Sequence, residues 1–298
     1  MSLDGLRELV GRLTTSTYAL SALGMALEAK VRAGGSPAEL GGALAEVLAA
    51  LDMTNALDEV TAASARPLLG EIQMALRHGV ARLGGAEAMP GWRHTDTVTL
   101  TAAGEVSAGF AAALQRFVPR LAGLAARLTG QAAAFLDVGV GVGALSIEMA
   151  RTWPLLRVVG IDIWAPSLAL ARENVRRAQL QHRIELREQG VHDVPDEAAF
   201  DLAWLPSAFI PGDLIREALR RIRRGLRPGG WVLFATATAD GDPLTLALAR
   251  LRNKEWGATP YSAAEAEALL AQADFAEIAT LPRPPASVAA FIAGRVPG

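Results

Sequence analysis

The chain contains no cysteine, and this absence removes several kinds of site at once. Disulfide bonds, thiolate zinc sites and cysteine nucleophiles are all excluded. Only four histidines are present, and none stands at metal-ligand spacing from another. We therefore expect neither thiol chemistry nor a metal centre.

Net charge is nearly absent as well. The chain carries 29 basic and 31 acidic side chains, for a formal net charge of −2. Such a balance gives no bulk attraction to nucleic acid or to an anionic membrane. Arginines do gather in residues 216–227, but Ile215, Leu219, Ile222 and Leu226 recur there at helical spacing. We interpret these arginines as the solvated side of an amphipathic helix.

Targeting signals are also missing from the pattern. The first turn carries Asp4, Arg7 and Glu8, where a secretory signal has a basic stretch followed by an apolar run. No stretch of about 18 apolar residues lacks charges, which argues against a transmembrane span. We expect a soluble, cytoplasmic protein that binds neither nucleic acid nor membrane.

The chain is rich in hydrophobic residues. Hydrophobic residues make up 51% of its 298 residues, enough for a large α/β domain and a smaller unit. Apolar residues at helical spacing predict a first helix across Leu6–Leu27. Gly34-Gly35 would end it, and Ser36-Pro37 would begin the next. A third helical stretch covers Leu57–Leu83, with Pro67 as a break or kink.

A cluster of glycines and a proline between Gly84 and Gly91 predicts the domain boundary. We predict a helical N-terminal domain at residues 1–90, used as a lid or for dimerisation, and a second domain at residues 91–298. The helical apolar surface is the one hint of a homodimer.

The second half of the chain has a different pattern. After a helix at about Ala103–Leu128, short apolar segments alternate with helical ones, which is typical of βαβ units and a parallel sheet. We predict helices near 143–152, 166–179, 212–226 and 262–272. The predicted strands are Ala134–Val138, Arg157–Ile163, Arg183–Arg187, Phe200–Leu205 and Trp231–Thr236, with Phe275–Leu281 and Val288–Arg295 as an antiparallel pair at the sheet edge.

A glycine-rich turn follows the first of these strands. Gly139, Gly141 and Gly143 would let the backbone turn tightly and approach a ligand, and the next helix would present free amide groups. Asp162, at the end of the second strand, could accept hydrogen bonds from both hydroxyls of a ribose. An adenosine-type ligand follows, but the same turn also fits a dinucleotide loop that ends at Ala144. The alternatives without a ligand are a plain tight turn and, for Asp162, a helix cap.

Further motifs select among these ligands. The segment Phe135–Gly143, the acid Asp162 with the helix after it, and the strand Phe200–Trp204 resemble the class I S-adenosylmethionine-dependent methyltransferases. Leu226–Gly230 and the C-terminal helix and strand are similar too. The resemblance spans about Phe135–Arg295. It implies a doubly wound, mostly parallel seven-stranded sheet, here preceded by an all-α domain.

The resemblance also implies roles for individual residues. Asp162 would hold the ribose, and Ile163 would pack on the adenine. Many relatives carry an acid where this chain has Gly190, so adenine recognition would fall to backbone amides or to Asp193. The full set of implied S-adenosyl-L-methionine contacts is Asp137, Gly139, Gly141, Gly143, Asp162, Ile163, Gly190, Val191, His192 and Leu205.

The acceptor end is less specified. His94 is a candidate general base, paired with Asp96 or reaching over the cofactor, or else an ordinary loop histidine. The segment after the fourth strand lacks the Asn/Asp-Pro-Pro-Tyr/Phe type of motif, which counts against a nucleobase acceptor. Side chains that would line a substrate pocket, or equally pack the core, are Trp92, Phe110, Trp204 and Phe209.

Taken together, we expect a methyltransferase acting on a small, fairly apolar organic acceptor at oxygen, with nitrogen or carbon as the alternatives, in a natural-product pathway. One alternative is an NAD-dependent oxidoreductase. It lacks support because the chain has only two lysines and two tyrosines, and no Tyr-x-x-x-Lys pair. Another is a non-catalytic protein of the same fold that still binds the cofactor.

Overall fold

The computed structural model describes residues 2–32, 41–83, 91–236, 242–282 and 289–298. The expected start of a helix at Ser36-Pro37 and most of the predicted boundary at 84–91 lie outside these residues. The chain folds into two compact units. Unit 1 comprises Met1–Ala86 and Thr101–Gly109, and unit 2 comprises Glu87–Leu100 and Phe110–Gly298.

Unit 1 is helical, as the apolar spacing predicts. Its core joins all four of these helices, and α1 packs along α4. Leu3, Leu6, Val10 and Leu13, in the first half of α1, are exposed. The helices of unit 1 are α1 (Leu3–Arg32), α2 (Gly41–Ala50), α3 (Thr54–Asp58) and α4 (Ala62–Leu83).

The expected break at Pro67 is wrong. Helix α4 begins at Ala62 and runs through Pro67 without interruption. Pro67 lies in the second turn and has no amide hydrogen, so the helix loses one backbone hydrogen bond there and continues. Gly109 has no side chain to collide with the Pro67 ring, which would lie 3.1 Å from a Cβ at that position.

The helix predicted across Ala103–Leu128 is in fact three elements. Helix α5 (Thr97–Phe117) starts at its cap Asp96, and the 3₁₀ helix η1 (Val118–Arg120) follows it. Helix α6 (Leu124–Leu128) begins after Gly123, whose φ of 75° interrupts the helical path. The prediction missed this interruption because the apolar spacing continues across it.

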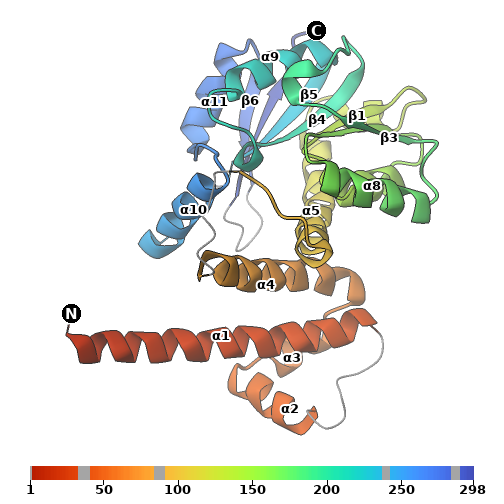
Figure 1. The fold of residues 1–298 in the computed structure, drawn as a ribbon. Coiled ribbons are helices and arrows are strands. Elements are labelled where there is room, and N and C mark those ends of the chain that lie inside the picture. The colour runs from red at the N-terminus through yellow and green to blue at the C-terminus, as the bar shows by residue number, and fades with distance from the viewer. Residues whose placement is uncertain (1, 33–40, 84–90, 237–241, 283–288) are drawn as a thin grey trace. The chain divides into compact units, whose positions relative to one another are not determined.

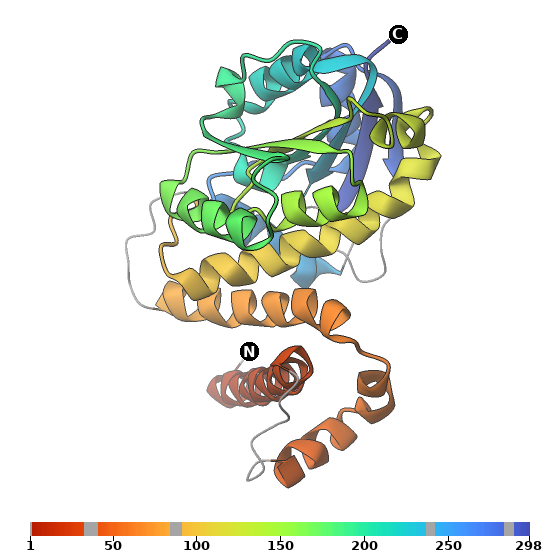
Figure 2. The ribbon, with the colours of Figure 1, turned by 90° about the vertical axis from the view of Figure 1, so that its right-hand side faces the viewer.

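Unit 2 contains a seven-stranded sheet in the order β3-β2-β1-β4-β5-β7-β6, which confirms the predicted fold class. Strands β1 to β5 are parallel, and β7 runs antiparallel to both of its neighbours. Figures 1 and 2 show helices on both sides of the sheet. The strands are β1 (Ala134–Val138), β2 (Arg157–Asp162), β3 (Ile184–Glu188), β4 (Phe200–Pro206), β5 (Leu226–Thr236), β6 (Ala276–Leu281) and β7 (Ala290–Arg295).

The helices of unit 2 cover two separate apolar layers. Successive strand residues point to opposite faces, so Phe135 joins one layer and Leu136 the other. Helices α5, α6 and α7 pack on the first layer, and α9 and α11 on the second. The remaining elements are α7 (Ala144–Thr152), α8 (Ala165–Arg177), η2 (Val191–Asp193), η3 (Ser207–Phe209), α9 (Ile215–Gly225), α10 (Pro243–Glu255) and α11 (Ala263–Gln272).

Two features of the C-terminal half differ from the predictions. The fifth strand begins at Leu226 and not at Trp231 as predicted, and its first part is irregular opposite Phe200 and Leu202 and passes through Gly229 at a φ of 76°. Helix α10 was not predicted at all.

One segment of the described chain, Thr97–Arg120, is long and apolar enough to cross a membrane by length and composition alone. The core helix of a soluble protein meets the same criterion. Leu114, Phe117 and Val118 of this segment are buried in the first apolar layer of unit 2.

Candidate functional site

The sheet reverses its winding between β1 and β4, because β2 and β3 lie on one side of β1 while β4 and β5 lie on the other. In open α/β sheets, ligands bind in the crevice outside the carboxyl ends of the strands at this point. The glycine-rich loop follows the carboxyl end of β1, so the order of the strands locates the candidate site.

The loop alternates glycine with valine for a structural reason. Gly139, Gly141 and Gly143 have φ angles of 69°, 55° and 79°, a region that disfavours side chains. Val140 and Val142 between them are buried. The loop is closed at its base by the Ile161 carbonyl oxygen, which accepts hydrogen bonds from the amides of Gly139 and Val140, both at 2.9 Å.

Asp162 ties this loop to the end of β2. Its Oδ2 accepts a hydrogen bond from the Gly141 amide at 2.8 Å, and its Oδ1 accepts one from the Trp164 amide at 2.8 Å. A carboxylate has about four lone-pair positions, so both oxygens retain capacity for two further donors. Burial raises the pKa of Asp162, against the lowering effect of these amide hydrogen bonds.

The next residue, Ile163, is 72% exposed. An aliphatic side chain left open beside a carboxylate at the strand end offers an apolar platform next to a polar anchor. The pairing fits a nucleoside, whose sugar hydroxyls and flat base need both. These features fit the adenosine part of S-adenosylmethionine. Ile163 offers an apolar surface, the Asp162 carboxylate can accept further hydrogen bonds, and the three glycines of the loop leave room for the ligand.

Asp137, predicted to contact the cofactor, is a buried residue. It is 2% exposed within β1, and the buried Ser146 hydroxyl donates a hydrogen bond to its Oδ2 at 2.6 Å. Burial raises the pKa of Asp137 to about 7, while the Ser146 bond lowers it and the nearby Asp162 charge raises it. This carboxyl therefore supports the loop from beneath.

At the end of β3, where many relatives carry an acid, this chain has Gly190. A Cβ on Gly190 would lie 2.4 Å from Cε1 of His192, so the imidazole covers that position. His192 in turn contacts Asp193, with Nε2 and Oδ2 3.2 Å apart, and both side chains are substantially exposed. Val191 is buried in the second apolar layer.

Gln189 is a residue of this region that the sequence analysis did not single out. Its backbone amide donates to the Asp162 carbonyl oxygen at 3.0 Å, which holds it beside the ribose candidate. Its side-chain Nε2 is buried and has no hydrogen-bond partner among the described residues. The signal in the sequence was only its place directly after a strand.

Two of the predicted pocket residues, Trp92 and Phe209, lie in an aromatic cluster. The Trp92 ring meets Phe209 at 5.4 Å and Trp256 at 5.6 Å, both edge to face. Phe209 stacks on Trp256 at 4.9 Å, and the Arg252 guanidinium lies over the Trp256 ring. Trp256 caps the end of α10, an element without a motif, so the sequence analysis missed it.

His94 belongs to this cluster, with its ring 4.7 Å from that of Trp92. Burial lowers the pKa of His94, and the Asp96 charge opposes this shift. Asp96 itself caps α5, because its Oδ1 accepts the Thr99 amide at 2.9 Å. His94 is therefore neutral near pH 7, the form in which an imidazole can accept a proton.

The predicted pocket residues fall into two groups. Trp92 and Phe209 join the cluster just described. Phe110 and Trp204 instead pack against each other at 5.3 Å and against Phe291, within the first apolar layer. Leu205 is fully buried in the second layer.

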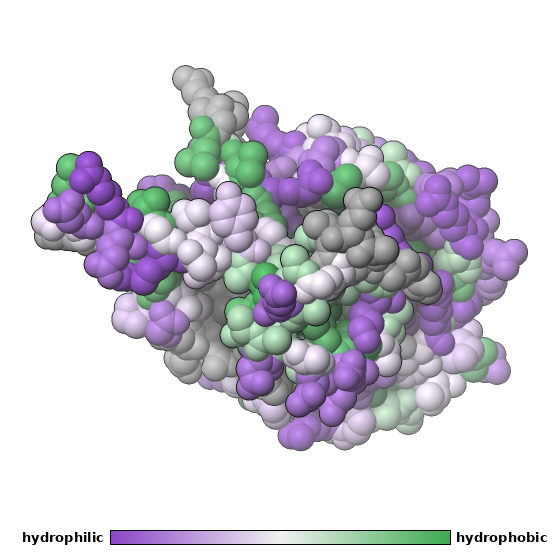
Figure 3. Space-filling model, turned by 90° about the horizontal axis from the view of Figure 1, so that it is seen from below, coloured by the Kyte–Doolittle hydropathy of each residue, from purple (hydrophilic) through white to green (hydrophobic). Residues whose placement is uncertain are grey.

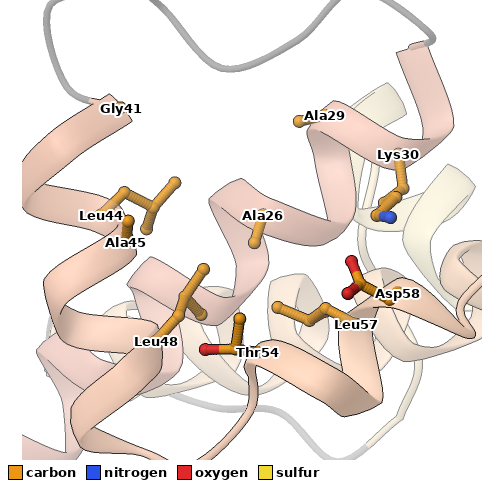
Figure 4. A pocket seen from close by; sticks show the side chains of 10 residues that line it. All are labelled: Ala26, Ala29, Lys30, Gly41, Leu44, Ala45, Leu48, Thr54, Leu57 and Asp58. Carbon is orange, nitrogen blue, oxygen red and sulfur yellow. The ribbon is translucent and has the colours of Figure 1, made fainter.

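Unit 1 holds a cavity of its own, of about 450 Å³. Figure 4 shows Leu44, Leu48 and Leu57 along its wall, with the Lys30 and Asp58 side chains at one side. None of the predicted site residues lines it. The cavity is mostly apolar, and one cation and one carboxylate do not make a catalytic group. We therefore do not assign the active site to this cavity.

Residues 135–230 match the family model described as a methyltransferase domain. Among curated proteins, the chain is 31% identical over 110 residues to the mitochondrial ubiquinone biosynthesis O-methyltransferase of Candida albicans. The alignment covers 35% of this chain and 32% of that protein. The chain spans less than half the length of the curated relatives it matches.

Solved structures match over nearly the whole chain. The mitomycin 7-O-methyltransferase MmcR has a TM-score of 0.61 at 19% identity, covering 98% of both chains. Human N-acetylserotonin methyltransferase, solved with S-adenosylmethionine, has a TM-score of 0.59 at 18% identity, covering 100% of this chain and 99% of that one. At such identities these likenesses establish the fold, N-terminal helices included.

Proposed function

Residues 135–230 form a class I S-adenosylmethionine-dependent methyltransferase domain, and from that premise we propose that the chain methylates an oxygen of a small, fairly apolar organic molecule. The observation that carries this is Asp162, bound to the glycine loop and followed by the open side chain of Ile163. The NAD-dependent alternative loses its support, since the domain match selects the methyl donor.

The cofactor supplies a methyl group on a sulfonium. Gly139, Gly141 and Gly143 leave room for it along the loop, while Asp162 accepts the ribose hydroxyls and Ile163 covers one face of the adenine. Gln189 is a better candidate for the adenine edge than Asp193. Its buried Nε2 is still without a partner among the described residues, whereas the exposed Asp193 carboxylate already contacts His192.

On the acceptor side, Trp92 and Phe209 offer apolar surface, and His94 stands among them as a neutral base. As the new carbon–oxygen bond forms and the methyl–sulfur bond breaks, the acceptor hydroxyl gives its proton to the imidazole. The remaining requirement is alignment of the acceptor, which positioning alone largely supplies. Oxygen is favoured because the relative named above and MmcR are both named for O-methylation.

Calorimetric titration with S-adenosylhomocysteine tests the cofactor site, and methyl transfer from labelled S-adenosylmethionine to a panel of phenols and alcohols tests the reaction. We expect binding in the micromolar range and transfer to at least one acceptor. No binding up to millimolar ligand would overturn the proposal. Binding without transfer across a broad panel would instead favour a non-catalytic protein of this fold.

We also propose that the chain forms a homodimer through α1. Exposed Leu3, Leu6, Val10 and Leu13 recur every three or four residues and continue the line on which Leu27 is buried against α4. In the view of Figure 3, hydrophobic residues are otherwise scattered among hydrophilic ones. Light scattering should give about twice the chain mass, and Leu6→Glu with Leu13→Glu should reduce it to one chain.

A further inference from the structure

Asn253 in α10 carries a buried amide that the fold does not use. The residue is 0% exposed, and neither Nδ2 nor Oδ1 has a hydrogen-bond partner among the described residues. An unmatched buried polar group costs about 1–3 kcal/mol, and more than nine tenths of such groups in native proteins are satisfied. A side chain with two of them points to a partner outside the described residues, and a bound ligand is such a partner.

A second polar group in the same condition is Ser207, the first residue of η3 after β4. It is 1% exposed, and its Oγ has no partner in the described part of the chain. Ser207 lies at the end of the sheet where the candidate site is, because η3 follows the carboxyl end of β4 and packs against β5.

The backbone holds these two segments together. The Asn253 carbonyl oxygen accepts the Ala258 amide at 2.9 Å, and Ala258 pairs with Pro211 in an isolated antiparallel bridge. Two residues after Ser207, Phe209 stacks on Trp256, which lies one helical turn after Asn253. The two unsatisfied groups are therefore joined through the aromatic cluster that contains Trp92 and His94.

The way α10 is turned argues against a purely structural role for Asn253. The described buried residues of α10 are Ala249 and Asn253, one turn apart, while Leu244, Leu248 and Leu251 are exposed. A helix oriented for stability alone would bury its leucines. This helix buries the amide of Asn253 in place of its leucines. Such a departure from the usual burial of apolar side chains is expected at functional sites.

We propose that Asn253, assisted by Ser207, binds a polar group of the acceptor other than the hydroxyl that is methylated, once side chains of the aromatic cluster move aside to admit it. This rests on the proposed function. A carboxamide offers one donor and one acceptor side by side, so its complement is a group that both donates and accepts. A carboxamide, a lactam or a carboxylic acid has that property. The acceptor is then a small molecule with an apolar body against Trp92, Phe209 and Trp256 and such a group at its inner end.

The stability arm of the test compares two asparagines. Asn253→Leu removes an unsatisfied amide, whereas Asn174→Leu removes one whose Nδ2 donates to the Val142 carbonyl oxygen at 3.0 Å. We expect Asn253→Leu to raise the melting temperature and Asn174→Leu to lower it. A fall for Asn253→Leu, and for the smaller Asn253→Ala, would show that the amide is satisfied within the fold and would overturn the proposal.

The ligand arm uses 4-hydroxybenzamide and 4-methylphenol, which share the ring and the hydroxyl and differ in the polar group. With the protein saturated by S-adenosylhomocysteine, titration should show 4-hydroxybenzamide binding at least fivefold more tightly. Asn253→Leu should bind both alike. Equal affinities in the unchanged protein, no binding of either probe, or a preference that survives Asn253→Leu would each overturn the inference. Failure of S-adenosylhomocysteine itself to bind would instead sink the proposed function.

Discussion

The indole Nε1 of Trp164 donates a hydrogen bond to the backbone carbonyl oxygen of His94 at 2.7 Å. Trp164 follows Asp162 and Ile163 at the end of β2, and His94 lies in the aromatic cluster near α10. Gly91, three residues earlier, donates its amide to the Glu255 carbonyl oxygen at 2.9 Å. The segment 91–96 is thus fastened at both the cofactor end and the acceptor end of the site.

Trp164→Phe should separate these two ends. It keeps a ring but loses the bond to His94, worth about 0.5–1.5 kcal/mol. We expect S-adenosylhomocysteine affinity to stay within about twofold, while kcat/KM for methyl transfer falls about tenfold as His94 loses its fixed position. Trp231→Phe is the matched control, because it breaks a similar bond to the Ala122 carbonyl oxygen far from the site and should lower stability only.

Asp162→Ala should weaken S-adenosylhomocysteine binding by at least about tenfold, near 1.4 kcal/mol, through loss of charge-assisted hydrogen bonds to the ribose. Titration calorimetry measures this directly. Glu188→Ala changes the exposed carboxylate at the end of the neighbouring strand, paired in register with Asp162, and should leave the affinity unchanged. Unchanged affinity in a folded Asp162→Ala protein would remove Asp162 from the site.

Gln189→Ala and Asp193→Ala discriminate between the two candidates for the adenine edge. We expect Gln189→Ala to weaken S-adenosylhomocysteine about five- to tenfold and Asp193→Ala to have no effect. The 1-deaza analogue, which lacks a ring-nitrogen acceptor for Nε2, should bind the unchanged protein more weakly, and Gln189→Ala should not distinguish the two ligands. The reverse ranking of the two variants would assign the adenine edge to Asp193.

Asp137 should make stability fall with rising pH. Its pKa is about 7 in the fold and about 3.8 when unfolded, so the folded chain binds the extra proton between these values. The contribution of Asp137 to the free energy of unfolding is complete below about pH 4 and is lost as the pH rises through 7. It amounts to at most ~4 kcal/mol. Denaturant unfolding from pH 4 to 8 should show a smaller slope for Asp137→Asn. Identical slopes would contradict the raised pKa.

Asp201 should be the costliest carboxylate to remove in unit 2. Its nearly buried side chain accepts from Arg227 at 2.5 Å, from Arg127 at 3.3 Å and from the Ala134 amide at 3.0 Å. Asp201→Ala leaves two guanidinium groups without their shared partner, for a loss of about 3–5 kcal/mol. Urea unfolding measures this loss. A loss below about 1 kcal/mol would place Asp201 among ordinary surface ion pairs.

Local signals explain what was predicted well. The strands, most helices of unit 2 and the loop from Gly139 to Gly143 follow from apolar periodicity and from the glycines that a tight turn requires. Two predictions failed because the surrounding structure outweighs a local signal. Helix α4 continues through Pro67 in its second turn, and strand pairing includes Leu226–Gly230 in β5.

The sequence by itself therefore determined the class of fold and the place of the cofactor, because both depend on spacing along one strand–turn–helix unit and on an acid at the next strand end. Only the tertiary structure decided which side chains share the acceptor end. It separated Phe110 and Trp204, which pack the core, from Trp92 and Phe209, and it added Trp256 and Asn253 from a helix with no motif. Such groupings depend on contacts between segments more than a hundred residues apart, and no local pattern in a single sequence encodes them.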